Sequence, residues 1–341
     1  MTTPRVGLGY RPGSAALLSA ALAALGALLV LASLMLGYVD IAPVDVLRGA
    51  FGLADEGTNT IVQDLRLPRT LLALLVGAAL GASGAVLQGL LLNPLAEPGV
   101  IGISASAGLG AVVVLYFGLT AVAPLALPIG GMLGAAAATA VLYLLAARHA
   151  STLTLILAGV AIGGLALALT SLAMNLSPNP WAVSEIVFWL LGSLRDRTFA
   201  EVTLAGPFIL AGLAILLTSG RALEALALGE DAARSLGVSL ARARAQAIIG
   251  TSLAVGASVA VAGAVGFVGL VVPHLLRPMV GYAPSRLILP SAIGGAALVL
   301  AADILVRLIA VGPELQLGVV TSLVGAPFFF YLILSMRGRL A

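Results

Sequence analysis

The strongest constraint on this chain is an uncharged run of 23 residues, 70–92, which follows Arg66 and Arg69 and ends before Asn93. With a rise of 1.5 Å per residue, a helix over this run would extend about 35 Å, enough to cross a hydrocarbon core of about 30 Å. Its many glycines and alanines would let neighbouring helix backbones approach closely within lipid. The run therefore predicts a buried spanning helix with a charged mouth at one end and a broken, polar turn at the other.

Composition extends this conclusion to the whole chain, since 61% of its 341 residues are hydrophobic and only 9% are charged. Soluble proteins average about 25% charged residues, so the composition indicates a polytopic membrane protein. Cysteine is absent and there are only two histidines, which argues against a disulfide or a metal centre. All 17 basic residues are arginine, so the chain has no Walker A lysine and is not expected to be an ATPase or another enzyme. No resident cofactor, catalytic residue or nucleic-acid partner is predicted.

The hydropathy pattern predicts ten spanning helices in one all-α domain, residues 1–341. A separate stretch, 181–194, is too short to span, and its two tryptophans favour a position at the membrane interface. Residues 37–64 are predicted to be an acidic external loop. The expected spans are 14–36, 70–92, 99–119, 124–148, 152–176, 202–219, 245–265, 267–280, 287–310 and 315–336.

Arginine placement predicts the orientation of these spans. With the N-terminus inside, eleven arginines fall on the inner side and six on the outer side, as the positive-inside rule requires. The six outer arginines are Arg48, Arg66, Arg69, Arg195, Arg197 and Arg307. Both termini are therefore expected to be cytoplasmic.

Two segments of the chain are similar to each other. VGAALGASGAV, residues 76–86, resembles VGASVAVAGAV, residues 255–265, and the same offset of 179 places Pro94 on Pro273. The two helices would cross the membrane in opposite directions, so the halves would be inverted copies, an arrangement found in transporters. The alternative is chance similarity between two helices rich in small residues.

Three arginines are predicted at the outer mouth: Arg66 and Arg69 at the start of one helix, and Arg307 at the end of another. They could bind acidic side chains of an external protein, because guanidinium groups pair with carboxylates in a bidentate manner. Alternatively they anchor the helices at the interface, with Asp303 as a local partner of Arg307 one turn earlier.

The segment 220–244 is the one long polar connection late in the chain, and it is predicted to form two short helices. The first is closed by Gly229, and the second, from Glu230 to Leu236, is closed by Gly237. Acidic residues at the start of the second helix and Arg234 toward its end suit the helix dipole. Such a segment could lie in a groove of a partner protein or rest on lipid headgroups.

Two turns flank the inner end of the expected path, around Asn93 and Leu95 and around Thr152 and Leu153. They could form a gate, or they could be simple helix caps, since Asn and Thr favour such positions. No catalytic constellation or buried carboxylate array is apparent, and Asp303 and Glu185 are both expected at the interface. This argues against a membrane enzyme and against an ion- or proton-coupled secondary carrier, which is kept as the alternative from another class.

Four long motifs stand out along the chain. In order, they are RLPRTLLALLVGAALGASGAVLQGLLLNPLAEPGVIGIS (66–104), LGEDAARSLGV (228–238), GAVGFVGLVVPHLLR (263–277) and LGVVTSLVGAPFFFYLIL (317–334). With these motifs, the sequence resembles the FecCD/BtuCD-type permeases of bacterial ABC importers over almost its whole length from about residue 14. These permeases take up ferric siderophores, haem or cobalamin.

The resemblance implies a type II importer permease in the bacterial inner membrane that works by alternating access. Its expected partners are a second copy of the chain, two ATPase subunits that bind ATP and Mg²⁺, and a periplasmic binding protein. The resemblance assigns binding-protein docking to Arg66, Arg69 and Arg307. It assigns ATPase coupling, within residues 220–241, to Leu226, Gly229, Glu230, Ala233, Arg234, Leu236 and Gly237. It assigns the gate and path to Asn93, Leu95, Thr152, Leu153, Leu172 and Asn175.

The transported ligand is not specified by any motif. An iron chelate, either haem or a ferric siderophore, is the first expectation because such ligands are frequent in the family. Cobalamin is the alternative. A wide path with small aliphatic walls suits any large, rigid chelate.

Overall fold

The structure is a computed structural model that describes residues 14–147, 152–309 and 314–337. The described residues form helices joined by short turns, with no strand among them. The principal helices are α1 (Ser14–Met35), α4 (Leu67–Leu90), α5 (Ile103–Tyr116), α6 (Ala126–Ala147), α7 (Thr152–Leu176), α9 (Phe199–Thr218), α12 (Leu240–Ala262), α13 (Val268–Leu276), α14 (Pro284–Ile309) and α15 (Leu317–Arg337).

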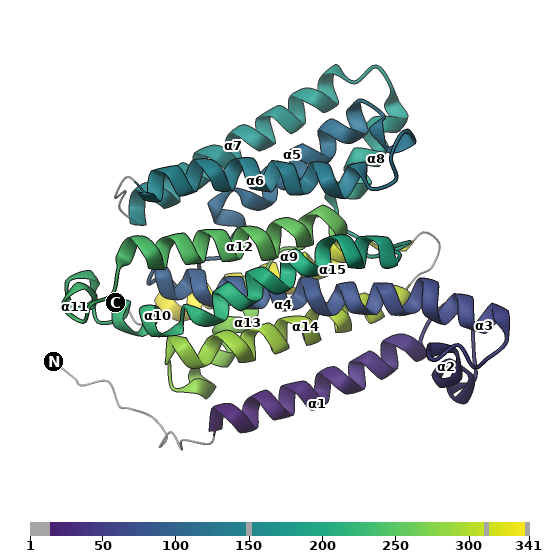
Figure 1. Ribbon diagram of the computed structural model, residues 1–341, viewed down its shortest axis with the longest axis horizontal. Coiled ribbons are helices and arrows are strands. Elements are labelled where there is room, and N and C mark those ends of the chain that lie inside the picture. Colours follow the sequence, from purple (N-terminus) through teal and green to yellow (C-terminus); the bar gives the residue numbers. More distant parts are fainter. Residues whose placement is uncertain (1–13, 148–151, 310–313, 338–341) are drawn as a thin grey trace.

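These ten helices correspond to the ten predicted spans. Within the described residues, seven candidate spans meet the length and hydropathy expected of a membrane crossing, and the helices α5, α8 (Pro180–Leu190), α13 and α15 are apolar but shorter. The helices run along one common direction (Figure 1). The helices α2 (Pro43–Ala50), α3 (Glu56–Thr60) and α8 lie at one end of the bundle, and α10 (Gly220–Leu226) and α11 (Glu230–Ser235) lie at the other. The predicted outer and inner connections therefore collect at opposite ends.

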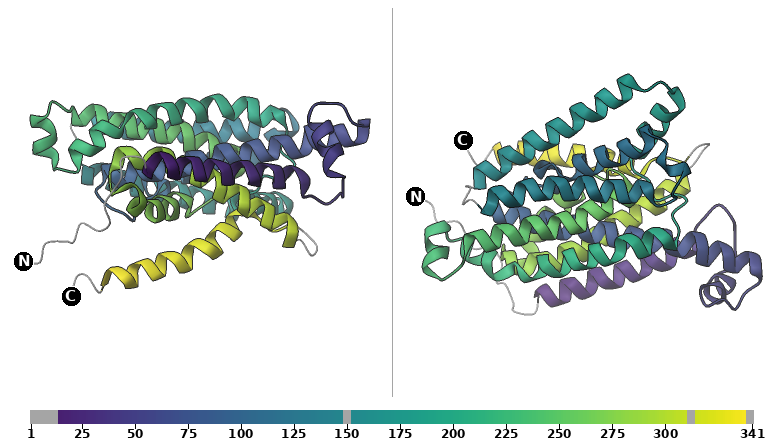
Figure 2. Two further views of the ribbon diagram at one scale, coloured as in Figure 1. Left: turned by 90° about the horizontal axis from the view of Figure 1, so that it is seen from below. Right: turned by 45° about the horizontal axis from the view of Figure 1, so that its top comes forward.

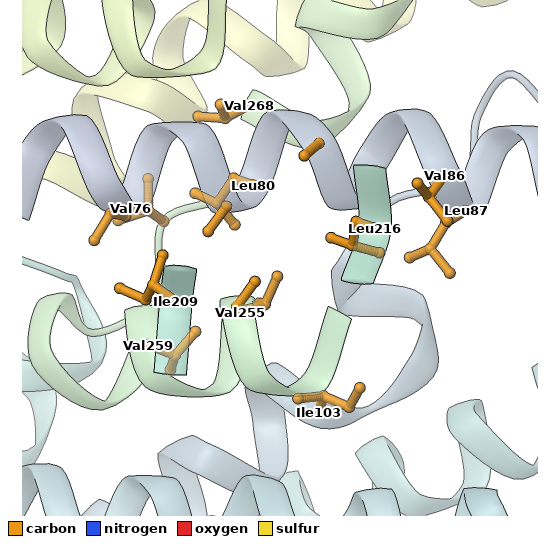
Figure 3. Close-up of a cluster of buried hydrophobic side chains, with 14 of the residues drawn as sticks. Val76, Leu80, Val86, Leu87, Ile103, Ile209, Leu216, Val255, Val259 and Val268 are labelled. Carbon is orange, nitrogen blue, oxygen red and sulfur yellow. The ribbon is translucent and has the colours of Figure 1, made fainter. Parts of the chain in front are cut away.

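Two central helices, α4 and α12, organise the core. Each is largely buried, and they contact each other as well as α9. Branched side chains from α4, α9 and α12, with Ile103 of α5 and Val268 of α13, fill the space between them (Figure 3). The small residues of α4 permit this packing: a Cβ atom at Gly81 would collide with the carbonyl oxygen of Ser291 on α14. The predicted close approach of backbones is confirmed.

The packing also agrees with the predicted inverted repeat. The helix α4 packs against α14 and α13, which belong to the second half, and α12 packs against α6 and α5, which belong to the first half. The offset of 179 aligns α4 with α12; if the following helices are paired in chain order, α5 corresponds to α13 and α6 to α14. Each central helix thus contacts the corresponding pair from the other half.

The prediction of an external loop over residues 37–64 is wrong in one respect, because much of this segment is helical. Helix α2 begins with Pro43, and the Asp55 side chain caps α3 by accepting a hydrogen bond from the Thr58 N–H at 2.9 Å. A π-helical segment, η1 (Ile61–Arg66), then continues directly into α4. A proline within a continuous helix removes one backbone hydrogen bond, and the wider π turn before Pro68 accommodates that loss. The spanning helix therefore starts well before residue 70, at Glu56.

Helix α15 diverges from the bundle, as the left view of Figure 2 shows. Its start is fixed by backbone hydrogen bonds from Leu317 N to Gly192 O at 2.8 Å and from Gly318 N to Leu191 O at 3.1 Å. Beyond that point it carries exposed apolar side chains, among them Leu323 and Phe330. An apolar helix that leaves its own bundle presents a large surface to lipid or to another protein.

Candidate functional site

The end of the bundle that the arginine distribution predicts to face outward, called the outer end below, contains a buried cluster of charges centred on Arg69 of α4. Its Nε donates to both carboxylate oxygens of Asp303 on α14, at 2.9 and 3.1 Å, and its Nη2 contacts Glu314, which precedes α15. Both acidic side chains are at most 4% exposed. The single guanidinium thus joins α4, α14 and the start of α15.

Arg307 completes this cluster from the next turn of α14. Its Nη2 lies 3.0 Å from Asp303 Oδ2 and 2.6 Å from the hydroxyl of Ser33 on α1, and its Nη1 donates to the Ser33 and Leu36 carbonyl oxygens at 2.8 and 2.9 Å. The predicted pairing of Arg307 with Asp303 is confirmed. Asp303 is only 1% exposed, a burial that the sequence analysis did not predict, whereas Glu185 is exposed. A buried carboxylate is stable here because it accepts hydrogen bonds from the Arg69 guanidinium and forms an ion pair with Arg307.

Arg66 uses backbone acceptors instead of carboxylates. Its guanidinium donates to the carbonyl oxygens of Leu34, Met35 and Val39 at 2.7, 3.1 and 2.5 Å. Within the described part of the chain, no carboxylate oxygen lies within 4.0 Å of it. The C-terminal end of α1 leaves carbonyl groups without intrahelical partners, and Arg66 satisfies them.

The three predicted docking arginines therefore lie together, and they line a pocket of about 250 Å³ at the outer end. Arg195, Asp196 and Arg197, from the connection between α8 and α9, also line it. Burial lowers the pKa of Arg197, although Glu201 and Asp196 lie nearby. Of the arginines at this pocket, Arg195 is the accessible one, with a side chain that is 56% exposed, against 11% for Arg69 and 4% for Arg307.

Sequence reasoning missed Glu314 and Ser33 as partners of these arginines and treated Arg195 only as a loop charge. Glu314 is distant in sequence from Arg69, and no local spacing links them. The sole available signal was that an acidic residue precedes the last helix on the same predicted side as the outer arginines.

The opposite end contains the predicted coupling segment. It forms two short helices, α10 and α11, separated by Gly229 with φ of 101° and followed by Gly237 with φ of 80°. Left-handed backbone favours glycine at both points. Two of the predicted coupling residues are buried against the bundle, Leu226 at 5% and Ala233 at 0% exposure.

Other residues of this segment face outward. Leu236 and its neighbour Leu228 are 64% and 69% exposed, and the Arg234 side chain is 60% exposed. Glu230 joins the segment to the bundle through an ion pair with Arg244 of α12 at 2.7 Å. The segment thus presents two leucines and mixed charges on a fold that is tied to a central helix.

Among the predicted gate residues at this same end, Asn93 and Leu153 are exposed and Leu95 is half-buried. Asn93 is exposed, and its Oδ1 accepts a hydrogen bond from the Leu95 N–H at 2.9 Å, an arrangement typical of a turn. Leu153 on α7 is 64% exposed. Thr152 begins α7, but its side chain lies outside the described residues.

The predicted path residues lie near the other end of α7. Leu172 is 51% exposed, and Asn175 donates to the Ser171 carbonyl oxygen at 2.9 Å within its own helix. A path-lining helix must have a face that its own bundle does not cover, and α7 and α15 both have one. The structure does not bring Asn93 and Leu172 together in one pocket.

Comparisons with known proteins agree with this architecture. The model of the FecCD transport family matches residues 24–335. The chain is 42% identical over 279 residues to the vitamin B12 import system permease protein BtuC of Klebsiella pneumoniae, covering 82% of this chain and 83% of that protein. It is also 42% identical over 294 residues to the uncharacterized ABC transporter permease protein YvrB of Bacillus subtilis, covering 85% and 83%.

The fold is also similar to a solved structure. A structure described as an inward-facing conformation of a metal-chelate type ABC transporter matches with a TM-score of 0.83 and 31% sequence identity, covering 93% of this chain and 98% of that one. The family match, the helical bundle and the two specialised ends all indicate the same kind of protein. The chain belongs to the FecCD transport family and is a membrane-spanning permease of the ABC importer type, in which separate subunits hydrolyse ATP.

Proposed function

We propose that this permease moves a large metal chelate of the cobalamin class from an external binding protein into the cytoplasm. The observation that carries this choice of substrate is the 42% identity, over more than four fifths of both chains, to a protein named for vitamin B12 import. Family frequency placed an iron chelate first and cobalamin second, and this identity reverses that order. Iron chelates become the second candidate, favoured by the structural similarity to a metal-chelate type transporter.

The outer pocket is the proposed docking site for the binding protein. Five arginines and two carboxylates line it, so its charge is positive and it suits acidic side chains. Because Arg66, Arg69 and Arg307 are buried, they would hold the shape and potential of the pocket, whereas Arg195 would meet the partner first. The acidic residues of the partner would then face a preformed positive surface.

The inner segment is the proposed coupling site. Leu228 and Leu236 would enter a groove of the ATPase, and the Glu230–Arg244 pair would transmit movement of α11 to α12. A second copy of the chain would cover the exposed faces of α7 and α15, with the path between the copies. A proton-coupled mechanism is disfavoured because the buried carboxylates, Asp303 and Glu314, are held by arginine partners.

The test is ATP-dependent uptake into proteoliposomes that contain this chain, its cognate ATPase and its binding protein. Cyanocobalamin, haem and a ferric siderophore are compared as ligands. We expect uptake of cyanocobalamin that requires both partners. Uptake of haem or the siderophore instead would overturn the substrate assignment, and uptake without ATP would overturn the coupling.

A charge reversal tests the docking site in the same assay. Arg195→Glu is expected to lower uptake at limiting binding protein by at least tenfold, because it places a negative charge at the rim of the pocket. The matched control is Arg48→Glu, which reverses an arginine of α2 whose side chain is 61% exposed at the same end. Equal uptake by the two variants would contradict docking at this pocket.

A further inference from the structure

A groove runs between α6 and α9, with α12 as its floor. The helices α6 and α9 both pack on α12, but they have few contacts with each other. The resulting cavity of about 610 Å³ lies within the range of about 300–1,000 Å³ in which proteins bind ligands of moderate size. Small residues line much of it, among them Ala135 and Ala140 on α6 and Gly256 and Ala257 on α12.

The walls of this groove are almost entirely apolar. Two hydroxyl groups among its lining residues are already used, because Thr139 donates to Ala135 O at 2.6 Å and Ser252 donates to Ile248 O at 2.7 Å. Larger side chains such as Phe208 and Leu253 form the rest of the wall. A hydrocarbon chain matches such a surface better than a polar ligand does.

A polar end continues this groove toward the coupling segment. A second cavity of about 470 Å³ shares Tyr143 and Ile249 with the first and is also lined by Thr218, Arg242 and Gln246. Arg242 and Gln246 are one helical turn apart on α12, so their side chains share a face. Arg242 is exposed and has no ion-pair partner among the residues that the structure describes.

The groove also lies on the side of the bundle opposite α15. In the left view of Figure 2, α9 and α15 lie at opposite faces of the molecule. The part of the proposed second-copy face that α15 contributes therefore lies away from the groove, whereas α7 packs on α6.

We propose that this groove binds an anionic phospholipid of the inner leaflet, with one acyl chain along α12 and the headgroup phosphate at Arg242. The inference rests on the proposed orientation, which puts Arg242 on the cytoplasmic side. Basic pockets between spanning helices on that side bind anionic headgroups. The apolar length and the single cation at its cytoplasmic end together match the two parts of such a lipid.

Native mass spectrometry of the full chain, stripped of lipid in detergent, tests the proposal. Dioleoyl-phosphatidylglycerol and dioleoyl-phosphatidylcholine serve as probes with the same acyl chains. We expect the anionic lipid to bind about fivefold more tightly, the effect of one arginine near an anionic headgroup. Equal binding of the two lipids would overturn the proposal.

Two variants separate the headgroup from the chain. Arg242→Gln is expected to reduce binding of phosphatidylglycerol to the level of phosphatidylcholine, whereas Arg221→Gln, at an exposed inner arginine outside the groove, leaves it unchanged. Ala136→Trp fills the groove and is expected to weaken both lipids, and Ala137→Trp, on the exposed face beside it, is the matched control. If a variant and its control had the same effect on lipid binding, in either pair, the result would contradict the proposed site.

The same spectra distinguish other occupants. If a second copy of the chain covered the groove, Ala136→Trp would shift the protein from dimer to monomer without changing lipid preference, and the proposal would fall. Because binding is measured without ATPase, binding protein or transported ligand, the result is independent of the proposed substrate and docking site.

Discussion

The outer charge cluster and the inner coupling segment use the same residue types in opposite ways. At the outer end, Arg69 and Arg307 share Asp303, and all three side chains are at most 11% exposed. At the inner end, Arg234 pairs with Asp231 at 3.0 Å, but their side chains are 60% and 98% exposed. Removing one partner of a buried ion pair strongly destabilises a protein, whereas an exposed pair contributes little to stability.

This difference suggests that the outer end is rigid and that the inner end can adjust to a partner. The outer cluster joins α1, α4, α14 and the start of α15, so the proposed docking surface is fixed before any partner arrives. The inner segment rests on α12 through Ala233 and the Glu230–Arg244 pair, and its outward residues remain available to a partner. Substitutions at the two ends should therefore affect different properties.

The largest effect on stability is expected from Asp303→Asn. Removing this carboxylate leaves Arg69 and Arg307 as buried cations with fewer partners, which should cost about 3–5 kcal/mol. Thermal unfolding of the purified permease in detergent measures the loss. A variant as stable as the parent chain would show that water or another group solvates the cluster.

A smaller loss is expected from Glu230→Gln, which breaks a half-exposed pair. The Arg244 side chain is 9% exposed and that of Glu230 is 41% exposed, so solvent screens part of the interaction and the cost should stay below about 1 kcal/mol. Because this pair links α11 to α12, uptake per ATP hydrolysed is expected to fall by more than stability does. An unchanged ratio of uptake to hydrolysis would remove the pair from the coupling route.

The contrast between the two ends also explains what the sequence could predict. Ten helices, the two short inner helices and the pairing of Arg307 with Asp303 follow from hydropathy, glycine positions and helical spacing, which are local signals. The partnership of Arg69 with Glu314 depends on how α4 and α15 meet, which no local spacing specifies. The burial of Asp303 was missed for the same reason, because its second guanidinium partner comes from a distant helix.

The least effect on stability is expected from Asp231→Asn. Its side chain is 98% exposed, and the change should stay within about 0.5 kcal/mol of the parent chain in the same unfolding assay. Set beside Asp303→Asn, it is a matched removal of one charge from an arginine-paired aspartate. Comparable losses at the two sites would refute the proposed difference between the ends.

A titration of Tyr38 probes the electrostatics of the outer cluster. Tyr38 lines the outer pocket, and desolvation, together with the charge of Glu314, raises its pKa above the ordinary value of 10.0. A raised pKa means that the protonated phenol is favoured in the fold; its contribution is intact below pH 10 and is lost as the pH rises through the folded pKa.

The phenolate absorbance of the parent chain minus that of Tyr38→Phe isolates this titration. In Glu314→Gln, the midpoint is expected to move part of the way back toward 10.0, since desolvation remains and the carboxylate charge is gone. The matched variant is Asp196→Asn, a second acidic residue of the same pocket with a side chain that is 81% exposed. It should shift the midpoint less, because solvent screens an exposed charge. If both variants moved the midpoint equally, solvent would screen the buried and the exposed carboxylate alike. The outer pocket would then behave like the solvent-exposed inner segment, and the proposed rigidity of the outer end would be contradicted.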